Sequence, residues 1–359
     1  MIKQIVKTLD GNEAAADVAY NFTEVATIYP ITPSSPMAEH VDVWSANGRK
    51  NLFGQPVKLV EMQSEAGAIG AVHGASETGS LCSSFTASQG LMLMIPVMHR
   101  LSGELKPVVL HIAARTVGTH TMSIFGDHSD VMGCRNTGWA MLCSASVQEC
   151  ADLAAVAHLS TIKGRVPFMH FFDGFRTSHE IQKIKMLPAE ELGKLIDRDA
   201  LYHFKHTGLN PEHPVMRSTV TNPDMFFQSR EANNPWYQRL PYIVQDYMDQ
   251  ISELTGRPYH LFDYYGAPDA EHVVIAMGSV TGAIQKTIDK LCKEGKKVGF
   301  IQVHLYRPFS LEHFMKAMPD TVRTITVMDR TKEPGALGEP LYEDVCAAMS
   351  HVKQDVTVL

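Results

Sequence analysis

The chain has 359 residues, of which 45% are hydrophobic and 20% are charged, and its formal net charge is −7. This length exceeds what one ordinary hydrophobic core requires, so we expect two domains. No apolar run reaches the ~18 residues that span a bilayer, and acidic and basic residues are interspersed. These features argue against a membrane protein and against binding to nucleic acid. The sequence does not open with a basic leader followed by an apolar stretch, so we expect a cytoplasmic protein.

Six cysteines are scattered along the chain, and none forms a Cys-x-x-Cys pair. The spacing therefore predicts neither an iron–sulfur cluster nor a zinc site in this chain. Because thiols stay reduced in the cytosol, we expect buried free cysteines.

Residues 12–173 alternate between amphipathic helices and short apolar strands. This pattern is typical of an α/β fold with a doubly wound, mostly parallel sheet, whose right-handed crossovers place helices on both faces. Predicted helices cover 12–22, 37–46, 64–77, a segment from 89 onward, and 147–162. Predicted strands cover 25–29, 57–60, 81–86, 108–114 and 166–172.

The alternation stops between residues 176 and 270, where proline, asparagine and aromatic residues occur without a clear period. The apolar content argues against disorder, and we interpret 176–258 as an ordered segment that wraps the first domain, with a helix at 236–255 as its one firm element. We therefore place the first domain at 1–258.

A second, smaller α/β domain is predicted for 259–359. Its expected strands are 273–277, 298–304 and 323–328, and its expected helices are 283–294, 311–318 and 341–349. Residues 356–359 read as the start of another strand, which indicates that this second domain is truncated.

Three runs at expected strand ends predict half of a thiamine diphosphate site: Tyr-Pro-Ile-Thr-Pro-Ser-Ser-Pro at 29–36, Gln-Ser-Glu-Ala-Gly-Ala at 63–68, and Ala-Ala-Arg-Thr-Val-Gly-Thr-His at 113–120. Open α/β sheets collect ligands at such positions. Glu65 begins a helix beside small residues, and a thiamine site needs a carboxylate that hydrogen-bonds the aminopyrimidine ring and so promotes loss of the thiazolium C2 proton. Arg115 and Thr32 could together bind a substrate carboxylate.

Each of these residues also has an ordinary structural explanation. A glutamate is favoured by about 0.3–1 kcal/mol at the positive end of a helix. An arginine at a strand end often forms a surface ion pair, and a threonine in a proline turn is usually a cap.

Two other motifs are weaker. The loop 120–130 contains two histidines and two aspartates, but it lacks the ligand spacing of a metal site, and such side chains normally bond their own backbone. The turn 278–282 is rich in glycine and serine, but it lacks both a Gly-x-Gly-x-x-Gly fingerprint and a P-loop lysine. A plain strand-to-helix turn is the better interpretation. We predict no metal site in this chain.

Five segments resemble the N-terminal region of single-chain pyruvate:ferredoxin (flavodoxin) oxidoreductases: 29–36, 61–70, 86–90, 113–132 and 329–335. The resemblance extends over nearly the entire chain. It implies a thiamine diphosphate pyrimidine-type domain followed by a transketolase C-terminal-like domain. It also implies that Glu65 contacts the aminopyrimidine with Pro30 as a further cofactor contact, and that Thr32 and Arg115 hold the carboxylate of pyruvate.

Complete members of that family add a coenzyme A-binding domain, a ferredoxin-like domain with [4Fe-4S] clusters, and a domain that binds the Mg²⁺–pyrophosphate end of the cofactor. Their motifs are absent from this sequence. The resemblance therefore implies a portion of a homo-oligomeric enzyme that converts pyruvate and coenzyme A to acetyl-coenzyme A and CO₂ and reduces ferredoxin or flavodoxin. We expect the isolated chain to be inactive.

Three alternatives stay open at this point. The substrate could be another 2-oxo acid, because an arginine–threonine clamp reads only the carboxylate. The chain could be a non-catalytic assembly module. A dinucleotide-binding dehydrogenase is weakened by the missing glycine fingerprint.

Overall fold

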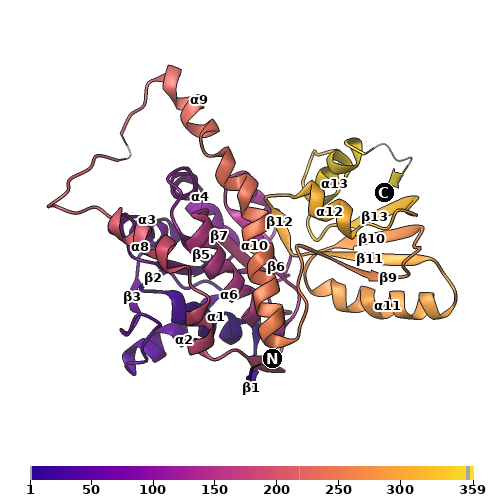
Figure 1. Cartoon of the computed structure of the whole chain (residues 1–359), viewed down its shortest axis with the longest axis horizontal. Coiled ribbons are helices and arrows are strands. Elements are labelled where there is room, and N and C mark those ends of the chain that lie inside the picture. Colours follow the sequence, from indigo (N-terminus) through magenta and orange to yellow (C-terminus); the bar gives the residue numbers. More distant parts are fainter. Residues whose placement is uncertain (1, 218, 353–355) are drawn as a thin grey trace.

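The larger of the two main sheets has seven strands and forms the centre of the first part of the chain (Figure 1). The computed structural model describes residues 2–217, 219–352 and 356–359. The strand order is β12-β6-β7-β5-β4-β2-β3, and β12 alone is antiparallel to its neighbour. The strands are β2 (Val25–Ile28), β3 (Lys58–Glu61), β4 (Cys82–Thr86), β5 (Val108–Ala114), β6 (Ala140–Ser144), β7 (Phe168–Asp173) and β12 (Leu305–Arg307).

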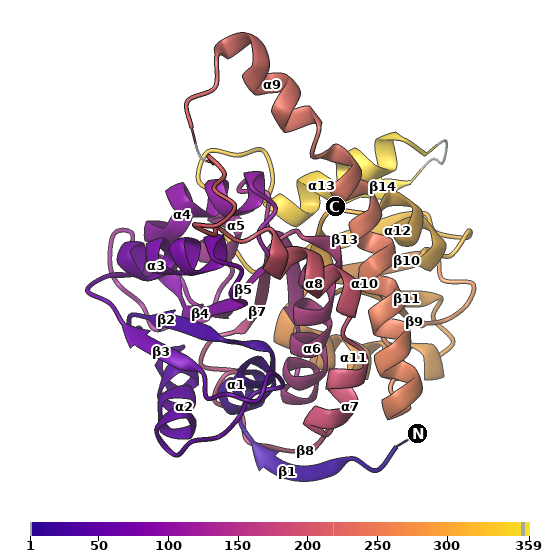
Figure 2. The ribbon, with the colours of Figure 1, turned by 60° about the vertical axis from the view of Figure 1, so that its left-hand side comes forward.

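Helices cover both faces of this sheet, as the alternating pattern predicts (Figure 2). One layer contains α1 (Gly11–Phe22), α2 (Ser35–Ala46) and α6 (Val147–Gly164), and the other contains α3 (Glu65–Glu77), α4 (Ser88–Gly103) and α5 (Ser129–Gly133). Because β4 to β7 lie between two helical layers, every residue of these strands is buried. Side-chain caps at Asp10, Ser64 and Ser146 begin α1, α3 and α6.

The predicted wrapping segment contains more regular structure than the sequence indicates. Strand β8 (Gln182–Met186) pairs with β1 (Ile5–Leu9), and four helices follow: α7 (Ala189–Lys194), α8 (Arg198–His206), α9 (Pro223–Glu231) and α10 (Asn234–Thr255). Helices α8 and α10 pack on α6. Helix α9 instead extends away from the rest of the molecule, and none of its residues is buried (Figure 1). The expectation of a single firm helix here is therefore wrong.

The smaller sheet has five strands in the order β14-β13-β10-β11-β9. They are β9 (Phe262–Gly266), β10 (His272–Ala276), β11 (Val298–Val303), β13 (Thr324–Met328) and β14 (Thr357–Val358), and only β9 is antiparallel. A short 3₁₀ turn η1 (Gly278–Val280) leads into α11 (Thr281–Lys293), which lies on the opposite side of the sheet from α12 (Leu311–Ala317) and α13 (Pro340–Ser350) (Figure 1).

A continuous hydrophobic core joins the two sheets. It includes residues of the larger sheet such as Leu142, of α10 such as Leu240, and of the smaller sheet such as Val303. The predicted α/β class with mostly parallel sheets is confirmed. The domain division at residue 258 stays a prediction.

All six cysteines are free thiols; four are buried, whereas Cys292 and Cys346 are partly exposed. Within the described residues, no helix combines the length and apolar character that crossing a bilayer requires.

Candidate active site

The carboxyl ends of four adjacent parallel strands form one edge of the larger sheet. The order β5-β4-β2-β3 places the segments that follow these strands side by side. The chain runs from β2 to β3 on one side of β2 and then to β4 on the other side. Such a reversal is a topological switch point, where open α/β sheets form ligand sites. The three predicted runs all follow strands of this group.

Arg115 joins the end of β5 to the turn after β2. Its Nη1 donates to the main-chain carbonyl oxygen of Thr32 at 2.6 Å, and its Nη2 donates to Oε1 of Gln89 at 2.6 Å. Two predicted site residues are therefore in contact. The contact uses the Thr32 carbonyl, and the exposed side chain of Thr32 has no hydrogen-bond partner among the described residues. Pro30 lies exposed in the same turn.

The Arg115 guanidinium retains unused hydrogen-bonding capacity. Its Nε is buried and has no hydrogen-bond partner in the described part of the chain. Partial burial lowers the pKa of Arg115, although the charge of Asp130 opposes this shift. An arginine stays protonated in proteins, so this side chain places a positive charge and unpaired N–H donors at the sheet edge.

Glu65 begins α3, and its side chain is buried against the first turn of α4. A Cβ added to Gly90 would lie 2.5 Å from Glu65 Oε1 and 2.8 Å from Thr86 Oγ1. The two oxygens therefore face the same point, and only a glycine leaves them room. Thr86 Oγ1 is buried without a partner, and no described residue donates a hydrogen bond to the Glu65 carboxylate.

The first turn of α4 lies between Arg115 and Glu65. Gln89 contacts Arg115, and the next residue, Gly90, contacts Glu65. Buried polar atoms nearly always have partners, so the unpaired Thr86 hydroxyl beside the Glu65 carboxylate indicates a polar group still to be bound there. A ring that both donates and accepts hydrogen bonds, such as an aminopyrimidine, fits this pair, because the carboxylate accepts and the hydroxyl can donate or accept.

Sequence reasoning missed the roles of Gln89 and Asp130. The run 86–90 contributes to the family resemblance, but nothing in it indicates a contact with Arg115. Asp130 was expected to bond only its own turn, and its Oδ1 does accept from Val131 N at 2.8 Å. Its Oδ2, however, accepts from Ser88 N at 2.8 Å and from Arg115 N at 3.0 Å. Burial raises the pKa of Asp130 to about 6.

The loop 126–130 is also fastened to the smaller sheet. His128 Nε2 lies 2.7 Å from Asp173 Oδ1, and Asp173 Oδ2 accepts from Ser279 N at 2.9 Å and lies 3.4 Å from Arg330 Nε. Burial alone would raise the pKa of Asp173, but the neighbouring His128 and Arg330 outweigh it and lower the pKa to about 2. Gly278, at φ +77°, approaches the same carboxylate, so the turn 278–282 serves as a structural junction.

A second cluster of possible ligands lies toward the far end of α3. Side-chain atoms of His73, Glu77 and Glu104 lie within 4.8 Å of one another. The ammonium of Lys106 lies 2.8 Å from Glu77 Oε1. Burial would raise the pKa of Glu77, but hydrogen bonds from Lys106 and neighbouring groups lower it to about 2. Because Lys106 already supplies the cation, we assign an ion-pair cluster and no metal here.

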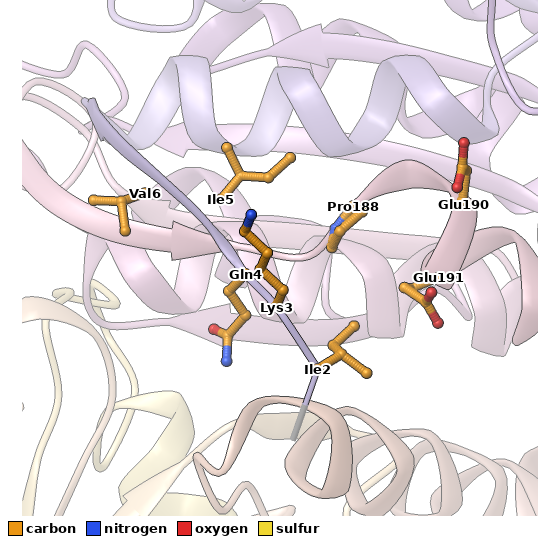
Figure 3. A pocket seen from close by; sticks show the side chains of 8 residues that line it. All are labelled: Ile2, Lys3, Gln4, Ile5, Val6, Pro188, Glu190 and Glu191. Atoms are coloured by element: carbon orange, nitrogen blue, oxygen red, sulfur yellow. The ribbon is translucent and has the colours of Figure 1, made fainter.

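A surface hollow of about 540 Å³ lies between β1 and the start of α7 (Figure 3). Its lining contains residues 2–6 together with Pro188, Glu190 and Glu191. None of the predicted site residues borders it, so this hollow is separate from the sheet edge that carries Arg115.

Two protein families match the chain. Residues 17–249 match the family described as pyruvate flavodoxin/ferredoxin oxidoreductase, thiamine diphosphate-binding, and residues 270–359 match pyruvate:ferredoxin oxidoreductase core domain II.

Curated relatives are much longer than this chain. It is 60% identical over 353 residues to a pyruvate:ferredoxin oxidoreductase of Moorella thermoacetica, with coverage of 98% of this chain and 30% of the relative. It is 61% identical over 346 residues to a pyruvate-flavodoxin oxidoreductase of Klebsiella pneumoniae, with coverage of 96% and 30%. A mitochondrial pyruvate dehydrogenase [NADP(+)] of Euglena gracilis is 52% identical over 347 residues, with coverage of 97% and 19%. The chain thus spans about 30% of the length of the first two relatives.

Solved structures show the same fold at low sequence identity. A 2-oxoglutarate:ferredoxin oxidoreductase from Magnetococcus marinus matches with a TM-score of 0.69 at 18% identity, covering 99% of this chain and 62% of that one. A split-gene transketolase matches with a TM-score of 0.53 at 9% identity, covering 97% and 86%. These likenesses agree with the predicted pyrimidine-type and transketolase-like fold.

Proposed function

Because this chain belongs to the pyruvate:ferredoxin/flavodoxin oxidoreductase family, we propose that it is the part of such an enzyme that binds the 2-oxo acid carboxylate and the aminopyrimidine of thiamine diphosphate. The complete enzyme would convert pyruvate and coenzyme A to acetyl-coenzyme A and CO₂. The observation that supports this most is the meeting of Arg115, the Thr32 turn and Glu65 around the first turn of α4.

Glu65 is the proposed cofactor-activating residue. Thiamine diphosphate, when bound, supplies the carbon nucleophile and the electron sink for decarboxylation. The Glu65 carboxylate would hold the proton of an aminopyrimidine ring nitrogen in a site already free of competing hydrogen bonds. Thr86 would offer a neighbouring hydroxyl, and Pro30 would contribute an apolar cofactor contact.

Arg115 and Thr32 are the proposed substrate-binding residues. Two guanidinium N–H groups hold the Thr32 carbonyl and Gln89, which fixes the plane of the side chain. The remaining donors, with the free Thr32 hydroxyl, would bind the carboxylate. These two residues would contact only the carboxylate of the substrate, so another 2-oxo acid is the alternative substrate. Pyruvate is favoured because relatives that are 60% and 61% identical to this chain are named as pyruvate oxidoreductases.

The remaining functions belong to other parts of the complete protein. The relatives are about three times as long as this chain, and we propose that their further length supplies the Mg²⁺–pyrophosphate site, coenzyme A binding and the [4Fe-4S] clusters that reduce ferredoxin or flavodoxin. The isolated chain would then lack oxidoreductase activity. We also propose that its two domains meet at residue 258. We also propose that the complete enzyme is cytoplasmic and homo-oligomeric.

Substitution of Glu65 in the complete enzyme tests this proposal. Glu65→Ala is expected to slow pyruvate-dependent ferredoxin reduction by about 10²–10⁴-fold, because the proton at the ring nitrogen loses its acceptor. The matched control is Glu190→Ala in α7, an exposed glutamate on the hollow that is separate from the sheet edge, and it is expected to keep full activity. Full activity of Glu65→Ala would instead support the non-catalytic assembly module.

A further inference from the structure

One buried carboxylate connects two elements of the candidate site. Asp130 is fully buried in α5, and its Oδ2 accepts hydrogen bonds from the main-chain N–H groups of Ser88 and Arg115. Ser88 opens α4 and Arg115 ends β5. A single carboxylate oxygen therefore holds the backbone of Ser88, the residue before Gln89, close to the backbone of Arg115. The side chains of Gln89 and Arg115 meet at the site.

The backbone at Ser88 shows that this connection imposes a conformation. Ser88 has φ +51°, in the left-handed region that residues other than glycine rarely adopt. Its Oγ lies 2.8 Å from the carbonyl oxygen of Thr116 and 2.5 Å from Gln89 Oε1. The unusual backbone is thus held by Asp130 on one side and by the segment after β5 on the other, and it directs Gln89 toward Arg115.

We propose that Asp130 is a positioning residue for substrate recognition, whose carboxylate aligns the backbones of Ser88 and Arg115 so that Gln89 holds the guanidinium rigidly with its free N–H donors toward the 2-oxo acid carboxylate. This inference rests on the proposed function of Arg115. Asp130 does not itself touch the substrate. It acts by removing the freedom of Arg115 to turn away from the sheet edge.

A purely structural role makes a different prediction. If Asp130 only stabilised the fold, its removal would lower activity by the same factor whether or not Arg115 were present. If it acts through Arg115, its removal matters only while Arg115 is there. A double-mutant cycle separates these cases.

The experiment uses the complete enzyme with four variants: Asp130→Ala, Asp130→Asn, Arg115→Ala and the double variant Asp130→Ala/Arg115→Ala. The readouts are the KM for pyruvate, kcat and the Kd for thiamine diphosphate. Asp130→Ala is expected to raise the KM about tenfold and to leave the cofactor Kd unchanged. In the Arg115→Ala background the same substitution is expected to add less than about twofold to the KM.

The conservative variant keeps the test decisive if Asp130→Ala does not fold. Asn retains one acceptor oxygen for Ser88 and Arg115 but presents an amide N–H₂ to the N–H of Val131, so a smaller rise in KM is expected. The matched control is Asp127→Asn, because among the described residues Asp127 bonds only Ser129, in the same loop. This variant is expected to leave the KM unchanged.

Additive effects of Asp130→Ala and Arg115→Ala would overturn the positioning role, as would an unchanged KM in both Asp130 variants. A failure of the proposed function itself would give a different result. In that case Arg115→Ala alone would leave the KM for pyruvate unchanged, whatever the Asp130 variants do.

Discussion

Three histidines form a hydrogen-bonded chain where β5 and β7 of the larger sheet pack against α6. His111 Nδ1 lies 2.9 Å from His170 Nδ1, His111 Nε2 lies 3.0 Å from His158 Nε2, and His170 Nε2 lies 2.8 Å from Ser144 Oγ. Burial lowers the pKa of His111 to about 3 and lowers the pKa values of His158 and His170 well below 6.5. The three rings are therefore neutral in the folded chain at neutral pH.

This chain of histidines makes stability depend on pH in a defined direction. Below pH 6.5 the unfolded chain binds protons at these residues and the folded chain does not, so the free energy of unfolding falls as the pH falls toward about 3. His158→Gln keeps an N–H donor for His111 but does not titrate. Between pH 6.5 and 5, the unfolding free energy of this variant should fall less steeply with pH than that of the unsubstituted chain. We expect the two slopes to differ by up to about 1.4 kcal/mol per pH unit.

Urea unfolding at several pH values measures this difference. Ser160→Ala, also in α6, provides the control, because neither serine nor alanine titrates in this range and this variant should decline as steeply as the unsubstituted chain. Equal slopes for His158→Gln and the unsubstituted chain would contradict the assignment.

Gly90 provides a test of the close packing around Glu65. An alanine Cβ would lie 2.5 Å from Glu65 Oε1, so the carboxylate must move. A displacement of this size is expected to lower the activity of the complete enzyme about 100-fold. Gly103→Ala, at the other end of α4, meets nothing within 4 Å and should leave activity unchanged. Comparing the turnover of the two variants measures the effect, and equal activity would show that Glu65 does not need its observed position.

At the scale of elements, α9 contributes no buried residue to the folded chain. We therefore expect Phe227→Ala, in α9, to change the free energy of unfolding by less than about 0.5 kcal/mol. The same change at Phe204, which α8 buries, should cost about 3–5 kcal/mol. Urea unfolding of the two variants provides the measurement, and a large loss with Phe227→Ala would mean that α9 packs on its own chain.

The elements that the sequence predicts well are those with a regular hydrophobic period. The helix predicted at 147–162 is α6, and the strand predicted at 108–114 is β5. The missed elements are short or depend on distant partners. Strand β12 has three residues and exists because it pairs with β6, more than 160 positions earlier in the chain. Strand β1 is exposed at most positions and depends on β8 for its pairing.

The same limit applies to the site. The placement of Glu65 and Arg115 at one edge was predictable because each follows a strand of a parallel sheet, and such ends share one edge; their roles stay predictions. The hydrogen bonds of Asp130 to Ser88 and of Gln89 to Arg115 join elements that are distant in the sequence. No local pattern encodes such contacts, so they required the structure.

At the scale of the whole molecule, the two sheets share more than an apolar boundary. Asp173, at the end of β7, connects His128 of the larger unit to Ser279 and Arg330 of the smaller one. His128 lies two residues before Asp130. The smaller sheet is therefore joined by direct polar contacts to the loop that contains Asp130, although Arg115 and Ser279 belong to different sheets.

Strand β12 has a consequence for any attempt to separate the two family-matched segments. Leu305 pairs with Leu142 of β6, and both side chains are fully buried. Cleavage near residue 258 would remove this pairing and leave β6 as an open edge with apolar side chains beside it. Open edges of this kind promote association between molecules. The first 258 residues, expressed alone, would thus be a sheet missing its outermost strand, and insolubility of that fragment would reflect a lost neighbour and not an intrinsically unstable fold.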